Sequence, residues 1–189
     1  VTVSGNKVFF RTHDANNDRE LYVADASGVT RLGNIRTTGS SEPDGLIATS
    51  TGVVFTADHD FYGREPWITD GTVGGTRLLV DVNARAGSVS FDSLTSVNGK
   101  IIYRFNDNVR GWQIVASDGT SQGTSVAQIN SSGTSDPSEL LSLGSRAVFN
   151  AVNAQSDRQL YVSDGTAVGT TVILDINSLG NDNVGNMAL

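Results

Sequence analysis

The sequence contains no cysteine, only two lysines and three prolines, and no apolar run long enough to cross a membrane as a helix. The absence of cysteine excludes a disulfide framework, a thiolate metal site and a cysteine nucleophile. The 13 Lys and Arg residues are scattered, and 20 Asp and Glu residues leave a net charge of −7 at pH 7. Without a basic cluster, neither nucleic acid nor an anionic membrane surface is an expected partner. The N-terminus lacks the regions of a signal peptide, so we expect a soluble piece or an already trimmed one.

The abundant residues favour turns and strands. Sixteen of the 20 carboxylates are Asp, and 21 residues are Gly. Asp, Asn, Ser, Thr and Gly favour turns, whereas helix surfaces usually carry Glu and Lys. Short runs rich in Val, Ile, Phe and Tyr separate these turn clusters, as strands do. The composition therefore predicts an all-β chain.

One segment is repeated four times along the chain. Four strand-like runs end in an aromatic residue at intervals of 45, 48 and 46 residues, at Phe10, Phe55, Tyr103 and Phe149. Segments ten residues further on read ELYVAD, EPWITD, QIVASD and QLYVSD, and the last three continue as GTVGGT, GTSQGT and GTAVGT. The copies span approximately residues 1–45, 46–93, 94–139 and 140–189. Repeats of this length are typical of propellers, solenoids and arrays.

Each copy contains four strand-like runs separated by turn signals. In the third copy they are Leu94–Val97, Lys100–Phe105, Trp112–Ser117 and Ser125–Ile129. A single four-stranded meander cannot cover both of its faces, so neighbouring copies must stack on one another. We predict one all-β domain over residues 1–189, a four-bladed β-propeller of four-stranded antiparallel blades. A four-repeat fragment of a larger propeller, a β-solenoid and a sandwich are the alternatives.

The repeat resembles the ELWxxDGT repeat of large bacterial secreted and cell-surface proteins, a hyalin-like, propeller-like family. The resemblance covers the whole chain and is strongest in GREPWITDGTVGGTRLLVDVN (Gly63–Asn83) and in Arg158–Asn177. It extends to SEP at Ser41–Pro43 and SDP at Ser135–Pro137. The first copy departs from the pattern, because Asp25-Ala26-Ser27-Gly28 lacks the Gly-Thr pair, and we expect a shorter turn there. The resemblance implies a propeller-like architecture in a bacterial, exported protein, and it brings no catalytic residues.

The most repeated residues have structural explanations. Asp70, Asp118 and Asp164 open turns in which an Asp side chain accepts a backbone N–H two residues on. The aromatic columns are expected to pack between blades. These columns are Phe10, Phe55, Tyr103 and Phe149 on the second strand, and Tyr22, Trp67, Val115 and Tyr161 on the third.

Candidate ligand-binding residues lie in the loops between the second and third strands, which differ most between copies. Variable polar loops on a rigid scaffold are where binding is normally placed. Trp112 stands where the other copies carry Arg19, Arg64 and Arg158, at a position suited to stacking on a sugar or peptide. The expected ligand-binding residues are His13, Asp58, His59, Asp60, Tyr62, Asp107, Arg110 and Trp112.

The first of these loops is also a candidate calcium site. Asp14, Asn16, Asp18 and Glu20 alternate as the first four ligands of a calcium loop do. The match is incomplete, because the sixth position is Arg19 and not Gly. A solvated acidic turn is the alternative.

Catalysis has little support in the sequence. No nucleophile motif, phosphate loop or zinc spacing accompanies His13 and His59. The sequence favours a non-catalytic, extracellular binding or adhesion module that presents acidic loops to carbohydrate or protein ligands, without membrane insertion and with calcium as the candidate cofactor. A carbohydrate-active hydrolase using Asp58, Asp60 and Glu65 is one alternative. A structural subunit that assembles with other copies is another.

Overall fold

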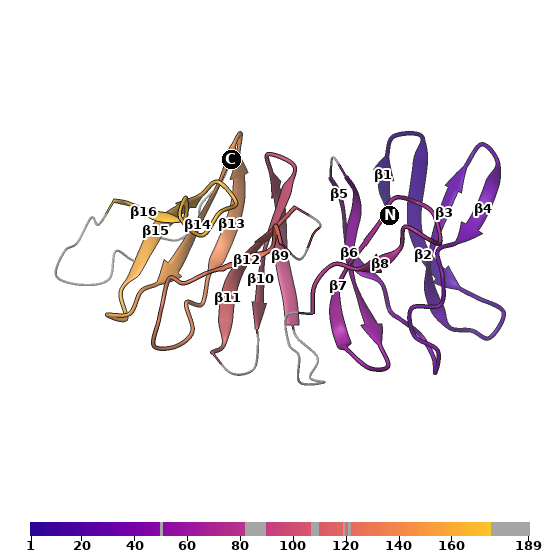
Figure 1. Cartoon of the computed structure of the whole chain (residues 1–189), viewed down its shortest axis with the longest axis horizontal. Coiled ribbons are helices and arrows are strands. Elements are labelled where there is room, and N and C mark those ends of the chain that lie inside the picture. Colours follow the sequence, from indigo (N-terminus) through magenta and orange to yellow (C-terminus); the bar gives the residue numbers. More distant parts are fainter. Residues whose placement is uncertain (50, 82–89, 107–109, 119, 121, 175–189) are drawn as a thin grey trace. The chain divides into compact units, whose positions relative to one another are not determined.

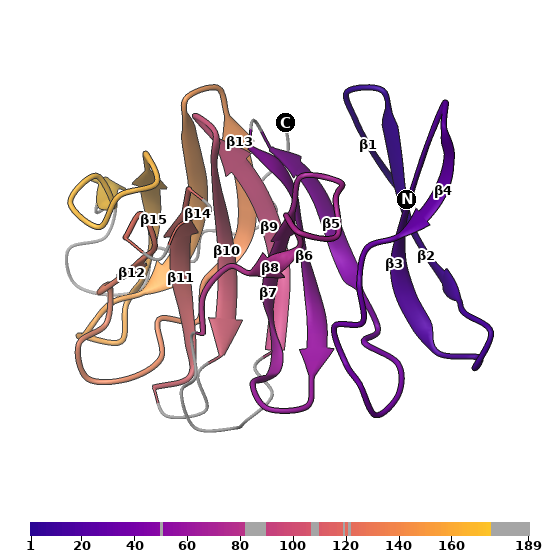
Figure 2. The ribbon, with the colours of Figure 1, turned by 45° about the vertical axis from the view of Figure 1, so that its right-hand side comes forward.

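The computed structural model describes residues 1–49, 51–81, 90–106, 110–118, 120 and 122–174. These residues form four antiparallel sheets of four strands each, and this part of the chain contains no helix. The strands of each sheet follow one another in chain order (Figures 1 and 2). The all-β prediction and the four-stranded meander of each copy are confirmed. No helix capable of spanning a bilayer occurs among the described residues.

The sheets are named A to D in chain order. Sheet A consists of β1 (Thr2–Ser4), β2 (Lys7–His13), β3 (Arg19–Asp25) and β4 (Gly28–Arg31), and sheet B of β5 (Asp44–Thr49), β6 (Gly52–His59), β7 (Gly63–Thr69) and β8 (Arg77–Leu78). Sheet C consists of β9 (Ser90–Val97), β10 (Lys100–Asn106), β11 (Trp112–Ser117) and β12 (Ser125–Ala127), and sheet D of β13 (Ser138–Leu143), β14 (Arg146–Val152), β15 (Arg158–Ser163) and β16 (Thr171–Leu174).

The strands of the third copy differ from the prediction at three ends. β9 begins at Ser90 and not at Leu94, β10 ends at Asn106 and not at Phe105, and β12 ends at Ala127 and not at Ile129. The pairing of β9 with β10 shifts register between Ile102 and Arg104. A bulge of this kind lets pairing resume beyond an irregular residue. β9 therefore extends beyond its expected start at Leu94 to Ser90.

The chain divides into two compact units, Val1–Val89 and Ser90–Leu189, and each unit holds two sheets. In the first unit β1 lies beside β5, and in the second β9 lies beside β13. Neighbouring sheets of a unit therefore meet through their first strands. The closed ring of four blades stays a prediction.

In the first unit, sheets A and B share one apolar core. Strand alternation sends every second side chain of a sheet to the same side, so one face of each sheet lines this core. The core residues are Phe9, Leu21, Val23, Leu32 and Ile35 from sheet A and the segment that follows it, and Val53, Phe55, Ala57 and Trp67 from sheet B. Phe55 is completely buried. The stacking of successive repeats thus supplies the cover that one sheet lacks.

The second unit repeats this arrangement. Its core residues are Val97, Ile102, Ile114, Ala116 and Ala127 from sheet C, and Ala147, Phe149, Ala151 and Tyr161 from sheet D. The rings of Phe149 and Tyr161 stack with centroids 5.9 Å apart. The expected packing of the aromatic columns between neighbouring sheets is confirmed for Phe55 and Trp67 in the first unit and for Phe149 and Tyr161 in the second. Phe10 differs, because it is half-buried and stacks on Tyr22 on the side of sheet A that points away from Phe9.

The Asp-Gly-Thr turns have the expected chemistry. Asp70 Oδ1 accepts hydrogen bonds from the backbone N–H of Thr72 at 2.8 Å and from its hydroxyl at 2.7 Å. The same pair of bonds holds Asp118 to Thr120 and Asp164 to Thr166. The threonine hydroxyl is the main cause that lowers the pKa of each of these aspartates. In the first copy, β3 ends at Asp25 and β4 begins at Gly28, so the turn is shorter, as expected.

Candidate functional site

Asp14, at the start of the loop between β2 and β3, is held by the backbone of that loop. Its Oδ1 accepts hydrogen bonds from the N–H of Asn16 at 2.8 Å and of Asp18 at 3.1 Å. Arg31 bridges two carboxylates, with Nη1 3.0 Å from Asp14 Oδ2 and Nη2 3.4 Å from Glu20 Oε1. The backbone hydrogen bond from Asp18 is the main cause that lowers the pKa of Asp14. An arginine therefore supplies positive charge between two of the expected calcium ligands.

The predicted calcium site receives no further support from the geometry. The described residues contain no group of three or more His, Asp or Glu side chains placed to hold a metal ion. Calcium binding at Asp14, Asn16, Asp18 and Glu20 stays a prediction, and an ion there would have to displace Arg31.

Glu20 is a core residue and not part of the exposed loop. Its side chain is completely buried, and Oε2 accepts a hydrogen bond of 2.6 Å from the Ser41 hydroxyl. Burial is the main cause that raises the pKa of Glu20, against the opposing effects of Ser41 and Arg31. The third copy carries Gln113 at this position, where Oε1 accepts from the Ser135 hydroxyl at 3.2 Å. The position thus joins a sheet to the linker that follows it.

Replacing Glu20 by Gln is expected to remove a pH-dependent loss of stability. Because the folded-state pKa lies above the unfolded value of about 4.3, the parent loses stability as the pH rises from there through the folded pKa. The unfolding free energy of Glu20→Gln relative to the parent should therefore rise between about pH 4 and pH 7. Urea denaturation at several pH values measures this difference. Glu42→Gln, whose side chain is 38% exposed, is the control, and equal pH profiles of Glu20→Gln and the parent would contradict the argument.

Asp60, in the loop between β6 and β7, fastens a distant segment. It accepts hydrogen bonds from the backbone N–H of Thr37 at 2.8 Å, from the Thr37 hydroxyl at 2.6 Å and from the Thr38 hydroxyl. Arg36 Nε lies 3.2 Å from Asp60 Oδ1. These bonds, the Thr37 hydroxyl first, lower the pKa of Asp60. Asp60 therefore fixes the connection after β4 against the second sheet.

The same loop carries an aromatic cluster. His59 Nδ1 accepts the backbone N–H of Phe61 at 3.1 Å and of Tyr62 at 3.3 Å, so the neutral ring carries its proton on Nε2. The His59 ring centroid lies 4.7 Å from that of Tyr62 and 5.8 Å from that of Trp67. Phe61 is 75% exposed at the rim. Three of the predicted ligand residues, His59, Asp60 and Tyr62, are thus brought together.

A pocket of about 140 Å³ lies beside this cluster, between the segment after β4 and sheet B. It is lined by Leu32, Gly33, Asn34, Ile35, His59, Trp67, Val73 and Thr76. One wall is the Trp67 ring. Asn34 Oδ1 accepts from Arg31 at 2.5 Å, which directs the amide NH₂ of Asn34 to other partners. The lining of the pocket therefore combines the aromatic ring of Trp67 with the amide of Asn34 and the imidazole of His59.

The second unit has a pocket of about 320 Å³ at the equivalent repeat position. Tyr161, Ala167 and Thr170 line it, and each lies 94 residues after a residue that lines the first pocket, Trp67, Val73 or Thr76. Gln128 and Ile129 also line this pocket. Burial raises the pKa of Tyr161, so its hydroxyl stays protonated at neutral pH. A pocket with an aromatic wall thus recurs once in each unit.

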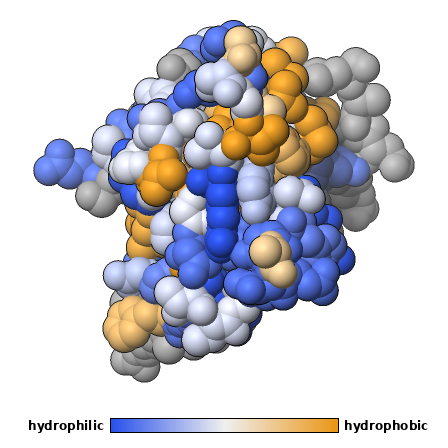
Figure 3. Space-filling model, turned by 90° about the vertical axis from the view of Figure 1, so that its right-hand side faces the viewer, coloured by the Kyte–Doolittle hydropathy of each residue, from blue (hydrophilic) through white to orange (hydrophobic). Residues whose placement is uncertain are grey.

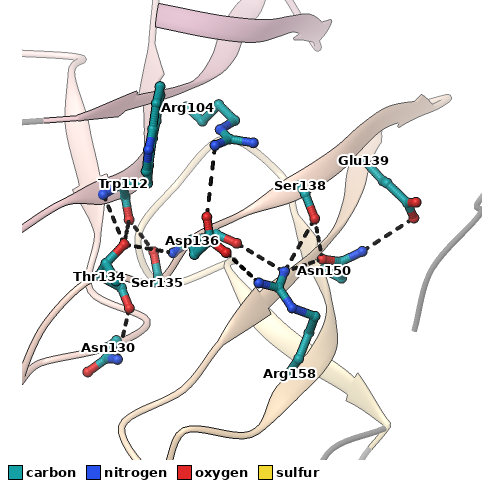
Figure 4. A network of polar contacts seen from close by, with 10 residues as sticks. All are labelled: Arg104, Trp112, Asn130, Thr134, Ser135, Asp136, Ser138, Glu139, Asn150 and Arg158. Carbon is teal, nitrogen blue, oxygen red and sulfur yellow. Dashed lines mark hydrogen bonds and ion pairs between the residues drawn. The ribbon is translucent and has the colours of Figure 1, made fainter. Parts of the chain in front are cut away.

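Trp112 belongs to a polar network of the second unit (Figure 4). The Arg104 guanidinium carbon lies 4.2 Å from the centroid of the Trp112 ring. Arg158 donates to the Asp136 backbone oxygen at 3.0 Å and to the Asp136 carboxylate at 2.6 Å, while the Asp136 N–H lies 3.1 Å from Thr134 Oγ1. In the first unit, Arg64 donates a hydrogen bond of 3.1 Å to the backbone oxygen of Glu42, the linker residue equivalent to Asp136. Arginines of this column therefore anchor linkers.

The other predicted ligand residues have contacts of their own. His13 Nε2 accepts a hydrogen bond of 3.2 Å from Arg19 Nε, and Asp58 pairs with Arg64 at 3.4 Å. Asp107 lies outside the described residues. Arg110, like Trp112, belongs to the second unit, where its backbone oxygen accepts from Gln113 at 3.2 Å.

Sequence reasoning missed most of the pocket residues. Leu32–Ile35 and Val73–Thr76 flank fourth strands, whereas the predicted ligand residues lie in loops between second and third strands. The signal that would have found them is the aromatic column of Trp67 and Tyr161, which packs in the cores, as expected, and also lines the pockets.

Comparison of the sequence with protein-family models and with curated proteins gives no match. The resemblance to ELWxxDGT repeats therefore stays a prediction based on the repeated motif itself.

Proposed function

We propose that the chain is a non-catalytic, extracellular binding module that takes neutral carbohydrate in its two repeat pockets. The observation that carries this proposal is the recurrence of one pocket in both units, each with an aromatic wall at Trp67 or Tyr161. Ligand sites are typically concave and mostly apolar, with a few placed polar groups. The apolar C–H face of a sugar ring suits the aromatic wall, and its hydroxyls suit the donors of Asn34 and His59.

The charge of the protein supports a neutral ligand. A net charge of −7 disfavours phosphorylated and carboxylated sugars at long range. A monosaccharide has about 12 non-hydrogen atoms, and at about 0.3 kcal/mol per atom it would bind with a dissociation constant in the millimolar range. Such weak sites become effective when several bind one chain of sugars together.

The proposal includes a propeller architecture and an exported bacterial setting. The meanders stack in pairs, one pair in each unit, through equivalent faces, and this arrangement supports blades of a propeller. The resemblance to ELWxxDGT repeats supports the setting.

The paired carboxylates suggested for a hydrolase do not share a face. Ala57 pairs with Glu65 and Asp58 with Arg64, so Asp58 and Glu65 point to opposite sides of sheet B. Glu65 is also completely buried. This arrangement favours binding over glycoside hydrolysis.

Tryptophan fluorescence tests the first pocket directly. The protein has two tryptophans, so Trp112→Phe leaves Trp67 as the sole reporter within the pocket wall. Titration of this variant with neutral mono- and disaccharides should change its emission with a saturable, millimolar response. The control Trp67→Phe keeps only Trp112 and should show no change. Unchanged emission of Trp112→Phe with every neutral sugar, or an equal response of both variants, would refute the proposal.

A further inference from the structure

Within the first unit, one apolar face of sheet A is left uncovered. One row of paired residues crosses its four strands, on the side that points away from Phe9: Val3, Val8, Ala24 and Val29. Val3 is 63% exposed, Val8 38% and Val29 64%. Figure 3, which views the right-hand side of Figure 1, shows a patch of apolar atoms at its upper right above a hydrophilic region, and smaller apolar spots at its left. We call the side of a sheet that carries Phe10, or the residue at the same repeat position, its front face. The side that carries Phe9, or the equivalent residue, is its back face.

Each unit shows what covers a front face. In sheet B the front face carries Val53, Phe55 and Trp67, and the back face of sheet A packs on it through Phe9 and Val23. In the second unit the front face of sheet D, with Phe149 and Tyr161, is packed in the same way by sheet C. The cover of a front face is thus the back face of another sheet.

Within the second unit, sheet D has an uncovered back face of this kind. On its neighbouring strands, Val148 is paired with Leu141 and with Val162. These side chains lie on the side of sheet D opposite Phe149. Leu143, on the same side, is 61% exposed. This face is hollowed by a cavity of about 450 Å³ whose lining includes Leu143, Arg146, Val148 and Val162. One chain therefore offers both halves of the repeated contact.

A basic residue marks the contact in both units. Lys7 Nζ donates to the backbone oxygens of Asp70 at 3.4 Å and Gly71 at 3.3 Å, in the turn of the sheet that it faces. Lys100 Nζ donates to the Gly165 oxygen at 3.0 Å. The two lysines of the chain thus have the same role.

Sheet D has Arg146 at the position of these lysines, exposed and at the edge of the cavity. The matching turn on sheet A is Asp25-Ala26, whose backbone oxygens and carboxylate are complementary to a guanidinium.

The sizes of the facing residues also match. A Cβ added at Gly71 would lie 3.2 Å from the Phe9 ring, so that turn requires glycine. Sheet D has the smaller Val148 in place of Phe9 and a cavity beside it. The turn of sheet A has Ala26 in place of Gly71. The added methyl group of the turn is therefore matched by the space left at Val148.

We propose that the front face of sheet A in one copy docks on the back face of sheet D in a second copy of this chain. The Asp25-Ala26 turn enters the cavity, and Arg146 binds its backbone oxygens. The interface uses different surfaces on the two partners, so it is heterologous and extends head to tail into a ring or filament. It does not depend on carbohydrate binding.

Directed disulfide formation tests the docking, because the chain has no native cysteine. A Cβ at Gly165 would lie 3.4 Å from the Lys100 Cβ, close to the mean of about 3.8 Å in disulfides. Ala26→Cys and Arg146→Cys occupy the equivalent positions, and both residues are exposed. Mixed under mild oxidation, the two single variants should yield a covalent dimer containing one chain of each. The control pair Val168→Cys and Arg146→Cys should not, although Val168 is 91% exposed.

Light scattering provides a second measurement. The average mass of the parent should rise with concentration, and Val8→Glu should raise the dissociation constant about tenfold or more, because it buries a charge in the interface. Val168→Glu should leave the constant unchanged. Absence of the mixed disulfide, or a parent mass independent of concentration, would overturn the proposal. A monomeric internal disulfide in the double variant Ala26→Cys/Arg146→Cys would show that the two faces meet within one chain, as in the predicted closed ring of four blades, and would also overturn it.

Discussion

Truncation of Phe149 or Phe55 to Ala is expected to lower the free energy of unfolding by about 3–5 kcal/mol. Both rings are completely buried in the core between two sheets of one unit, and Phe149 also stacks on Tyr161. The loss combines the transfer free energy of the ring with the cavity that remains. Urea denaturation followed by fluorescence measures it, since Trp67 reports on the first unit and Trp112 on the second.

Phe10→Ala is the matched control for these truncations. Phe10 occupies the same repeat position and stacks on Tyr22 in the same way, but it is only half-buried on the open front face of sheet A. Its truncation should cost less than half as much as that of Phe149 in the monomer. Equal losses for the three phenylalanines would show that inter-sheet packing is not what makes the column important.

Gly71→Val is expected to destabilise the first unit by at least about 2 kcal/mol, from backbone strain and overpacking together. Gly71 has φ of 86°, a conformation that β-branched residues avoid. A Cβ there would lie 2.8 Å from Lys7 Cδ and 3.2 Å from Phe9 Cζ. The side chain would therefore enter the contact between the turn of sheet B and the back face of sheet A. Thermal and urea denaturation both measure the loss.

Two further variants separate the causes. Gly74→Val changes the same turn at a position where an added Cβ meets nothing within 4 Å, and it should alter stability by less than about 0.5 kcal/mol. Lys7→Ala combined with Gly71→Val removes the nearest obstructing side chain and should recover part of the loss, leaving the backbone strain. A Gly71→Val protein as stable as Gly74→Val would refute the assignment of this turn.

The polar column at Glu20 illustrates how repeat alignment and structure contribute differently. Alignment alone identified Glu20, Glu65, Gln113 and Gln159 as one position. It also suggested Glu20 as a calcium ligand, because an alternating acidic loop ends there. The structure buries the Glu20 carboxyl beneath Ser41, 21 residues away, in a contact that loop spacing does not reveal.

The candidate pockets show the same division. Trp67 and Tyr161 were identified as a column, and His59 and Tyr62 as loop residues, from the sequence. Their combination with Leu32–Ile35 depends on how sheet A and the segment after β4 pack on sheet B. This packing brings Leu32–Ile35 beside Trp67 and Val73. Side-chain volumes at the core decide that packing, and no periodicity encodes it.

The sequence by itself determined the all-β class, the four repeats, the four-stranded meander and the Asp-Gly-Thr turns. These features depend on local chemistry: strand alternation, hairpin dipeptides, and hydrogen bonds between residues two apart, such as Asp70 and Thr72. Only the tertiary structure decided which side of each sheet is covered, why Lys7 lies against Gly71 across 64 residues, and why Arg31 lies between Asp14 and Glu20. The Lys7 contact arises because sheet A packs on sheet B, and the Arg31 contacts arise within sheet A, where β4 brings Arg31 to β3 and to the loop between β2 and β3. In both cases the packing of large and small side chains sets which distant groups come within bonding distance.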